Sequence, residues 1–300
     1  MTCAPSIAFA MLSHRGRVRR SNQDACAALP EHGAFVVCDG MGGAAGGEVA
    51  SHLATETFLN CLAQRPSTSP DPAAPKCAAS KSVLPHAPRQ PIHVAQLDPV
   101  TPARTRLTEA IHGANQAVFR YSLKSPRLQG MGTTLVALLW EETPASSTLW
   151  IAHVGDSRCY RLRSGSLQLL TRDHSLVEEQ VRAGVLSRAQ ATASPLRNII
   201  TRAIGTQSTV EPEIAACDPQ RGDLYLLASD GLSRDLDEAA IARVLTRNAS
   251  PAAFAAVRGG PAKPGLAMQA ALDNACQALV DAANAKGGHD NITVLLLACS

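Results

Sequence analysis

The stretch that decides the fold is Phe35-Val36-Val37-Cys38-Asp39-Gly40-Met41-Gly42-Gly43. Four apolar residues run directly into an aspartate and a glycine-rich turn. The same arrangement recurs where Leu224 to Ser229 meets Asp230, and where Ile151 to Gly155 meets Asp156. Short apolar runs bounded by glycine, aspartate or proline are typical of buried strands. The pattern therefore predicts several carboxylates at the mouths of buried strands, where a rigid sheet can hold them together.

Strands and helices are both expected outward from this stretch. Ser164-Gly165 predicts a hairpin turn between two short strands, and hairpins favour antiparallel sheets. Long helical segments between groups of strands favour helices packed on sheet faces. Further strands are expected over residues 133–140, 148–154 and 292–297. Apolar residues at helical spacing predict helices over 49–62, 107–121, 237–247 and 272–283.

Composition excludes several classes of protein. The chain has 300 residues, of which 45% are hydrophobic and 18% charged, a globular composition rather than that of a disordered chain, collagen or coiled coil. A net charge of +3 without a dense Lys/Arg run argues against nucleic-acid binding. The apolar runs are far shorter than the roughly 20 residues of a membrane-spanning helix. The nine cysteines include no Cys-x-x-Cys pair, which favours reduced thiols in a cytoplasmic protein over a zinc site or disulfides.

One segment stands apart in composition. Residues 66–102 hold nine of the 19 prolines and no aromatic residue, so they can neither continue a helix nor bury much surface. We expect a single domain over residues 1–300 with a flexible Pro-rich insertion at 66–103. A docking role for this insertion is the weaker alternative.

The aspartates carry the chemistry. One Asp-Gly pair alone usually marks a turn, but five aspartates occupy comparable places: Asp24, Asp39, Asp156, Asp230 and Asp290. If they converge they repel, since two charges 4 Å apart cost about 4 kcal/mol at an effective dielectric of 20. Oxygen ligands without a Cys or His set select hard cations such as Mg²⁺ or Mn²⁺. The loop after Asp39 lacks the Lys-Ser/Thr ending of a phosphate-binding P-loop.

Seven motifs together resemble the metal-dependent type 2C serine/threonine protein phosphatases, most closely the bacterial branch. They occur in the family's order between Ala8 and Leu297. The motifs are Arg19-Arg20-Ser21-Asn22-Gln23-Asp24, Val37-Cys38-Asp39-Gly40-Met41-Gly42-Gly43, Gly130-Met131-Gly132-Thr133-Thr134, His153-Val154-Gly155-Asp156-Ser157-Arg158, Thr171-Arg172-Asp173-His174-Ser175-Leu176, Ser229-Asp230-Gly231-Leu232 and Gly288-His289-Asp290-Asn291-Ile292-Thr293-Val294.

The resemblance implies an α+β fold, a four-layer α-β-β-α sandwich of two antiparallel sheets flanked by helices. It also implies two Mn²⁺ or Mg²⁺ ions at one end, with a third held in bacterial members. Asp39 matches the metal-bridging aspartate, Gly40 a carbonyl ligand, and Asp24, Asp230 and Asp290 further ligands. Asp156 matches the aspartate that holds the third ion together with the Asp230 position. Arg19 matches the phosphate-binding arginine.

The implied reaction is hydrolysis of phosphoserine and phosphothreonine in proteins, opposing a Ser/Thr kinase in bacterial signalling. Two neighbouring ions lower the pKa of a shared water, which then attacks phosphorus in line. Asp39, Asp230 and Asp290 are the expected catalytic residues, and Arg19 suits the phosphate because a guanidinium presents parallel N–H donors. Met41 stands where eukaryotic relatives have a histidine acid, so a water is the default acid.

Two other readings compete. A serine hydrolase could be built on Ser157, but the chain lacks a G-x-S-x-G elbow there. A catalytically weak phosphoprotein-binding regulatory domain of the same fold would usually have lost a ligand, and none of the expected ligands is missing.

Residues 173–205 resemble the family's flap, with a short helix at Leu176, Val177 and Val181. Phosphorylated proteins and a kinase are the expected partners, and a monomer is favoured.

Overall fold

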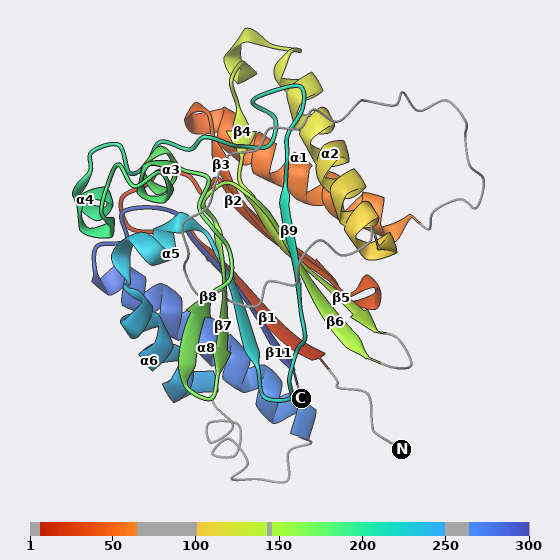
Figure 1. Ribbon diagram of the computed structural model, residues 1–300, viewed down its shortest axis with the longest axis vertical. Helices are drawn as coiled ribbons and strands as arrows, with labels where there is room; N and C mark the ends of the chain where they lie inside the picture. The colour runs from red at the N-terminus through yellow and green to blue at the C-terminus, as the bar shows by residue number, and fades with distance from the viewer. Residues whose placement is uncertain (1–6, 65–100, 143–145, 250–263, 300) are drawn as a thin grey trace.

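The computed structural model describes residues 7–64, 101–142, 146–249 and 264–299, and it forms four layers (Figure 1). Two antiparallel sheets lie face to face in the centre. Helices α1 (Gly43–Ala63) and α2 (Pro102–Ser122) cover one outer face. Helices α6 (Glu238–Ala249) and α8 (Pro264–Ala285) cover the other. The predicted α+β sandwich of two antiparallel sheets flanked by helices is confirmed.

The first sheet has the strand order β1-β11-β10-β7-β8. Its strands are β1 (Ile7–His14), β11 (Ile292–Cys299), β10 (Leu224–Ala228), β7 (Arg158–Arg163) and β8 (Ser166–Leu169). Short helix α5 (Asp230–Asp235) follows β10 directly. The predicted hairpin joins β7 to β8, with Ser164 at φ 51° and Gly165 at φ 81°, the left-handed pair that a tight hairpin turn needs.

The second sheet has the order β2-β3-β5-β6-β9, with β4 paired to β3. Its strands are β2 (Asp24–Leu29), β3 (Ala34–Met41), β4 (Gly132–Thr133), β5 (Leu135–Glu142), β6 (Ser147–Val154) and β9 (Glu213–Cys217). Short 3-10 turns lie at Pro30–His32 and Pro126–Leu128. Two short helices, α3 (Leu176–Arg182) and α4 (Arg188–Ala193), lie between β8 and β9.

The alternation of side chains along each strand builds the layers. In β3, Val36 and Cys38 face α1 and α2, whereas Phe35 and Val37 face the other sheet. Phe35 and Val37 join a cluster between the sheets that includes Tyr225 of β10 and inward-facing leucines of β11. Because the alternating side chains of one strand fill two cores at once, the central strands β3, β10 and β11 are largely continuous apolar runs.

Two predicted boundaries are wrong. The insertion does not extend to residue 103, because Pro102 and Ala103 already belong to α2 and the Thr101 side chain caps its first turn. Proline suits the first helical position, where its missing N–H is not needed. The strand predicted over residues 133–140 is interrupted at Thr134, whose backbone N–H donates to the Asp39 carbonyl. The rest of the predicted insertion, residues 66–100, lies outside the described part of the chain.

The described residues also show the state of the cysteines and the character of the helices. Their seven cysteines are free thiols, at positions 26, 38, 61, 159, 217, 276 and 299. Every helix in that part of the chain is too short or too polar to serve as a membrane span.

Candidate metal centre

Five aspartates meet at one end of the sandwich. Asp24 begins β2 and lies opposite Asp39 of β3 in the strand register. Asp156 lies between β6 of the second sheet and β7 of the first, and Asp230 and Asp290 adjoin β10 and β11 of the first sheet. The predicted carboxylates therefore come from both sheets into one pocket.

Mutual repulsion and loss of water perturb these carboxyl groups. Burial, followed by the neighbouring charges of Asp230 and Asp290, raises the pKa of Asp24 to about 7. Burial and the charge of Asp230 raise the pKa of Asp156 to about 7 as well. The pKa values of Asp39 and Asp230 are also raised above the ordinary range, chiefly by burial. Burial and mutual repulsion disfavour the ionised forms of these four carboxyl groups, so a bound cation would stabilise the site.

Three of these aspartates aim an oxygen inward without a hydrogen-bond donor. Among the described residues, Oδ1 of Asp24, of Asp156 and of Asp230 has no partner. The other oxygen of Asp24 is satisfied, since Ser229 Oγ donates to Asp24 Oδ2 at 2.8 Å. Buried oxygens that lack donors are costly unless a cation meets them. This donor set, all oxygen, fits a hard divalent ion.

Gly40 lies where a side chain cannot fit. A Cβ on Gly40 would lie 2.1 Å from the Gly47 carbonyl oxygen of α1 and 2.6 Å from the Gln23 carbonyl oxygen. The Gly40 N–H donates to that same Gln23 oxygen at 3.1 Å. Glycine is thus required for the strand to pass between α1 and the residue before Asp24, which keeps the Gly40 backbone beside the carboxylates.

Arg19 reaches the cluster from the loop between β1 and β2. Its Nη2 lies 2.7 Å from Asp290 Oδ2, and about half of its side chain is exposed. The buried side chain of Asn291 holds this loop: it donates to the carbonyls of Arg15 and Ser21 and accepts from the Gln23 N–H. The predicted phosphate-binding arginine is therefore fixed next to Asp290.

Arg234 of α5 is a residue that the sequence analysis did not find. Its guanidinium donates to Asp290 Oδ2 at 2.6 Å and to Asp230 Oδ2. It lies one turn after Asp230 on the same helix, and that spacing of four residues was the available signal.

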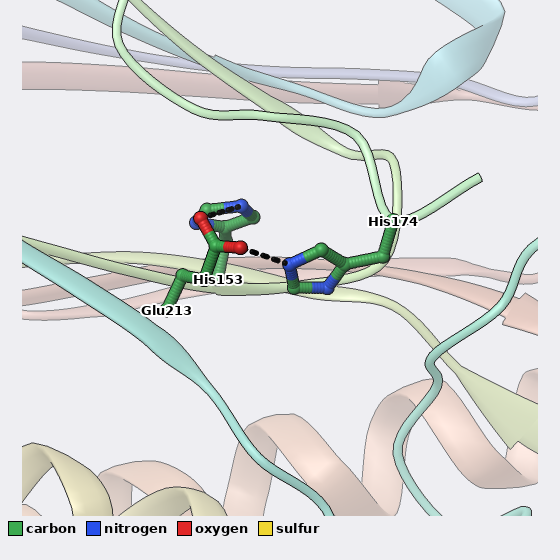
Figure 2. A group of neighbouring side chains, drawn as sticks. All are labelled: His153, His174 and Glu213. Carbon is green, nitrogen blue, oxygen red and sulfur yellow. Dashed lines mark ion pairs between the residues drawn. The ribbon is translucent and has the colours of Figure 1, made fainter. Parts of the chain in front are cut away.

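A second cluster lies behind Asp156 and consists of His153, His174 and Glu213 (Figure 2). Burial and the neighbouring His174 lower the pKa of His153 to about 4, so this imidazole is neutral at pH 7. His153 Nε2 lies 2.8 Å from the Arg172 carbonyl, and His174 Nδ1 accepts the Gly155 N–H. His174 Nε2 therefore carries the proton and faces Glu213 Oε1 at 3.2 Å.

These contacts favour a network of polar groups over a metal site. The short contact of His153 Nε2 with the Arg172 carbonyl needs a proton on that nitrogen, and the proton on His174 Nε2 faces the Glu213 carboxylate. Through His174, the network fixes Gly155, whose φ of 104° only glycine adopts easily, and thereby the turn that carries Asp156.

Ser157 does not have the surroundings of a catalytic serine. It is 1% exposed, and its Oγ lies 2.7 Å from Thr134 Oγ1. Thr134 Oγ1 also accepts the Asp39 N–H, so the hydroxyl pair supports the strand that bears Asp39. The serine hydrolase alternative is therefore not favoured.

Comparisons with known proteins agree with this geometry. The family model for protein phosphatase 2C matches residues 13–275. A serine/threonine phosphatase, stp, of Listeria innocua is 30% identical over 286 residues, covering 94% of this chain and 92% of that protein. The solved Mycobacterium tuberculosis serine/threonine phosphatase PstP/Ppp is 28% identical with a TM-score of 0.72, over 97% of this chain and 98% of the other. A structure of the PstP catalytic domain with two manganese ions is 27% identical with a TM-score of 0.69, over 98% of both chains.

Proposed function

Because the chain belongs to the protein phosphatase 2C family, we propose that its clustered aspartates hold divalent cations for hydrolysis. The enzyme is a protein-serine/threonine phosphatase and dephosphorylates phosphoproteins in signalling. The family is metal-dependent, and two Mn²⁺ or Mg²⁺ ions with a third beside them form the proposed set. The proposed ligands are Asp24, Asp39, the Gly40 carbonyl, Asp156, Asp230 and Asp290.

One observation carries this proposal. Carboxylates from both sheets converge, and Asp24, Asp156 and Asp230 each leave one buried oxygen without a donor. When bound, two divalent ions supply an activated water near neutral pH and offset charge on the phosphate. None of the proposed ligands is missing, so nothing here favours the alternative of a non-catalytic phosphoprotein-binding domain.

The chain's own residues then have separate tasks. Asp39, Asp230 and Asp290 would hold the ions, which makes them the proposed catalytic residues. Arg19, half exposed at the rim, binds the phosphate oxygens with its parallel N–H donors. The Thr134 and Asn291 hydrogen bonds keep Asp39 and the Arg19 loop in place, so little reorganisation is needed on binding.

The test combines metal uptake with turnover. We expect Mn²⁺ uptake by calorimetry and Mn²⁺-dependent hydrolysis of p-nitrophenyl phosphate, with both strongly reduced in Asp39→Asn. Asp281→Asn, on the exposed face of α8, is the matched control and should keep both. Mn²⁺ uptake without any hydrolysis by the wild type would support the non-catalytic alternative instead.

We further propose that residues 1–300 form one phosphatase domain with an insertion between α1 and α2, since elements on both sides of it build the same sandwich. A Ser/Thr kinase that phosphorylates the same proteins is the proposed counterpart, and a monomer the proposed state. The free thiols support a reducing compartment such as the cytoplasm. Size-exclusion chromatography with light scattering tests the monomer, and phosphoproteomics after gene deletion tests the kinase link.

A further inference from the structure

Arg234 lies in the metal centre but has no role in the mechanism proposed above. Its side chain is 24% exposed and donates to Oδ2 of both Asp230 and Asp290. Asp230 Oδ1 stays without a partner among the described residues. Arg234 therefore occupies the outer oxygen of Asp230 and leaves the inner one available.

Arg19 and Arg234 approach one and the same atom from different parts of the chain. Arg19 Nη2 lies 2.7 Å and Arg234 Nη1 lies 2.6 Å from Asp290 Oδ2. One guanidinium comes from the loop between β1 and β2, the other from α5. The two guanidinium groups are therefore neighbours that share one carboxylate oxygen, and they are placed to bind a common anion once cations neutralise the aspartates.

Arg234 is also accessible to a ligand. Together with Asp156, Asp230 and Ser233 it lines a cavity of about 380 Å³, which continues to Asn198 of the flap. A phosphate monoester that enters this cavity beside Asp156 and Asp230 meets Arg234, and Arg19 reaches the same Asp290 oxygen as Arg234 from the loop between β1 and β2. Its three terminal oxygens can accept from both guanidinium groups, which bind phosphate with fixed, parallel donors.

We propose that Arg234 is a second phosphate-binding residue of this enzyme, which with Arg19 clamps the phosphate group of the substrate from two sides. This inference rests on the proposed function, in which Asp230 and Asp290 bind cations. Bound cations would neutralise these carboxylates and so weaken their ion pairs with Arg234. The N–H donors of Arg234 would then bind the dianionic phosphate. The competing possibility is that Arg234 only neutralises the acidic cluster.

The decisive experiment measures phosphate affinity. Inorganic phosphate is titrated calorimetrically into the Mn²⁺-loaded wild type, Arg234→Ala and Arg234→Lys, after circular dichroism has shown that each is folded. Loss of one charge-assisted hydrogen-bonding group should raise the dissociation constant of phosphate, and KM for a phosphopeptide, by about tenfold or more. Lysine should restore part of the affinity, because it keeps the charge but not the fork. Arg243→Ala, which removes an exposed charge on α6, should change neither value.

Mn²⁺ affinity, measured on the same variants, separates the two roles. Unchanged phosphate affinity in Arg234→Ala together with tighter Mn²⁺ binding would overturn the clamp and identify a counter-ion. If the wild type takes up no Mn²⁺, the proposed metal centre fails. Without Mn²⁺ uptake the clamp fails as well, because Asp230 and Asp290 then keep Arg234 in their ion pairs. Mn²⁺ uptake with equal phosphate affinities in the loaded wild type and Arg234→Ala would overturn the clamp alone.

Discussion

At the scale of single residues, the two oxygens of one carboxylate have different tasks. Asp24 Oδ2 accepts a hydrogen bond from the Ser229 hydroxyl, whereas Asp24 Oδ1 has no donor among the described residues. In Asp230, Oδ2 accepts from Arg234 and Oδ1 likewise has no donor. A hydrogen bond on one oxygen fixes the rotamer and so directs the other oxygen inward. Outer hydrogen bonds of this kind typically change metal affinity by 10- to 100-fold when they are removed.

His153 gives a residue-scale prediction with a definite sign. Its pKa is lowered to about 4 in the folded protein, against about 6.5 in the unfolded chain. Between these values the unfolded chain binds more protons, so the stability due to neutral His153 is full above pH 6.5 and is lost as pH falls toward 4. His153→Gln should remove this part of the pH dependence.

Urea unfolding between pH 4.5 and 7.5, with chelator present, measures the effect as the difference between wild type and His153→Gln. His52→Gln, on an exposed position of α1, is the control and should follow the wild type. Parallel stability curves for wild type and His153→Gln would contradict the prediction.

The sequence identified the aspartates and Arg19 because each adjoins a recognisable strand or motif. It did not identify Arg234, Asn291 or the His174–Glu213 pair as participants. Their tasks depend on hydrogen bonds between segments far apart in the chain, such as Asn291 with Arg15 and Ser21. No local pattern encodes such a distant partner, so these roles had to come from the three-dimensional arrangement.

At the scale of elements, helix α2 holds the loop after the flap through one side chain. Asn115 is 2% exposed; its Oδ1 accepts the Gly205 N–H at 2.7 Å, and its Nδ2 donates to the Gln207 and Ser208 carbonyls. Asn115→Ala leaves the buried Gly205 N–H unpaired and should lower the free energy of unfolding by about 1–3 kcal/mol. Chemical denaturation checks this, and Gln116→Ala on the exposed side of α2 should stay near wild type.

The crossing of β3 and α1 gives a second element-scale prediction. Gly40→Ala places a methyl group 2.1 Å from the Gly47 carbonyl, so strand and helix must move apart. We expect a loss of about 1–3 kcal/mol in stability, as for other overpacked sites, together with weaker Mn²⁺ binding. Gly113→Ala in α2, where the new Cβ would meet the side chains of Cys61 at 3.0 Å and Thr57 at 4.0 Å but no backbone, is the comparison. Equal melting temperatures and equal Mn²⁺ affinities for the two variants would contradict this account.

At the scale of the whole molecule, the strands missed by sequence inspection share one property. β1 lies at the edge of the first sheet, and β2 and β9 lie at the two edges of the second. Each of these edge strands has one free flank and is mostly only partly buried, and its short apolar run is rich in alanine. Strands such as β3 and β11, which are buried on both faces, are richer in valine and leucine and were predicted from sequence.

The convergence of both sheets on one acidic pocket predicts how the metal-free protein responds to pH. Asp24 and Asp156 have a pKa of about 7 when folded, against 3.8 as their ordinary value. Between pH 3.8 and 7 the folded state binds more protons than the unfolded chain. The contribution of Asp24 and Asp156 to stability is therefore full below pH 4 and is lost as pH rises through 7. The single opposing contribution of His153 is outweighed by the four raised carboxyls.

We therefore expect the melting temperature in chelator to fall between pH 5 and 8. Saturating Mn²⁺ should raise it most at the upper end, because binding to the folded state alone stabilises it by mass action. Scanning calorimetry with and without Mn²⁺ provides the measurement. A flat or rising melting temperature in chelator would contradict the repulsion between the two sheets.

The length of α1 separates the two ends of this enzyme. The helix starts at Gly43, just after Asp39 and Gly40, and runs for 21 residues to Ala63. At 1.5 Å per residue it spans ~30 Å. Ala63 therefore lies at the opposite pole to the aspartates. A fluorophore or an affinity tag attached at Gln64, the exposed residue that follows the helix, can report on the enzyme, or immobilise it, far from the space where phosphate is cleaved.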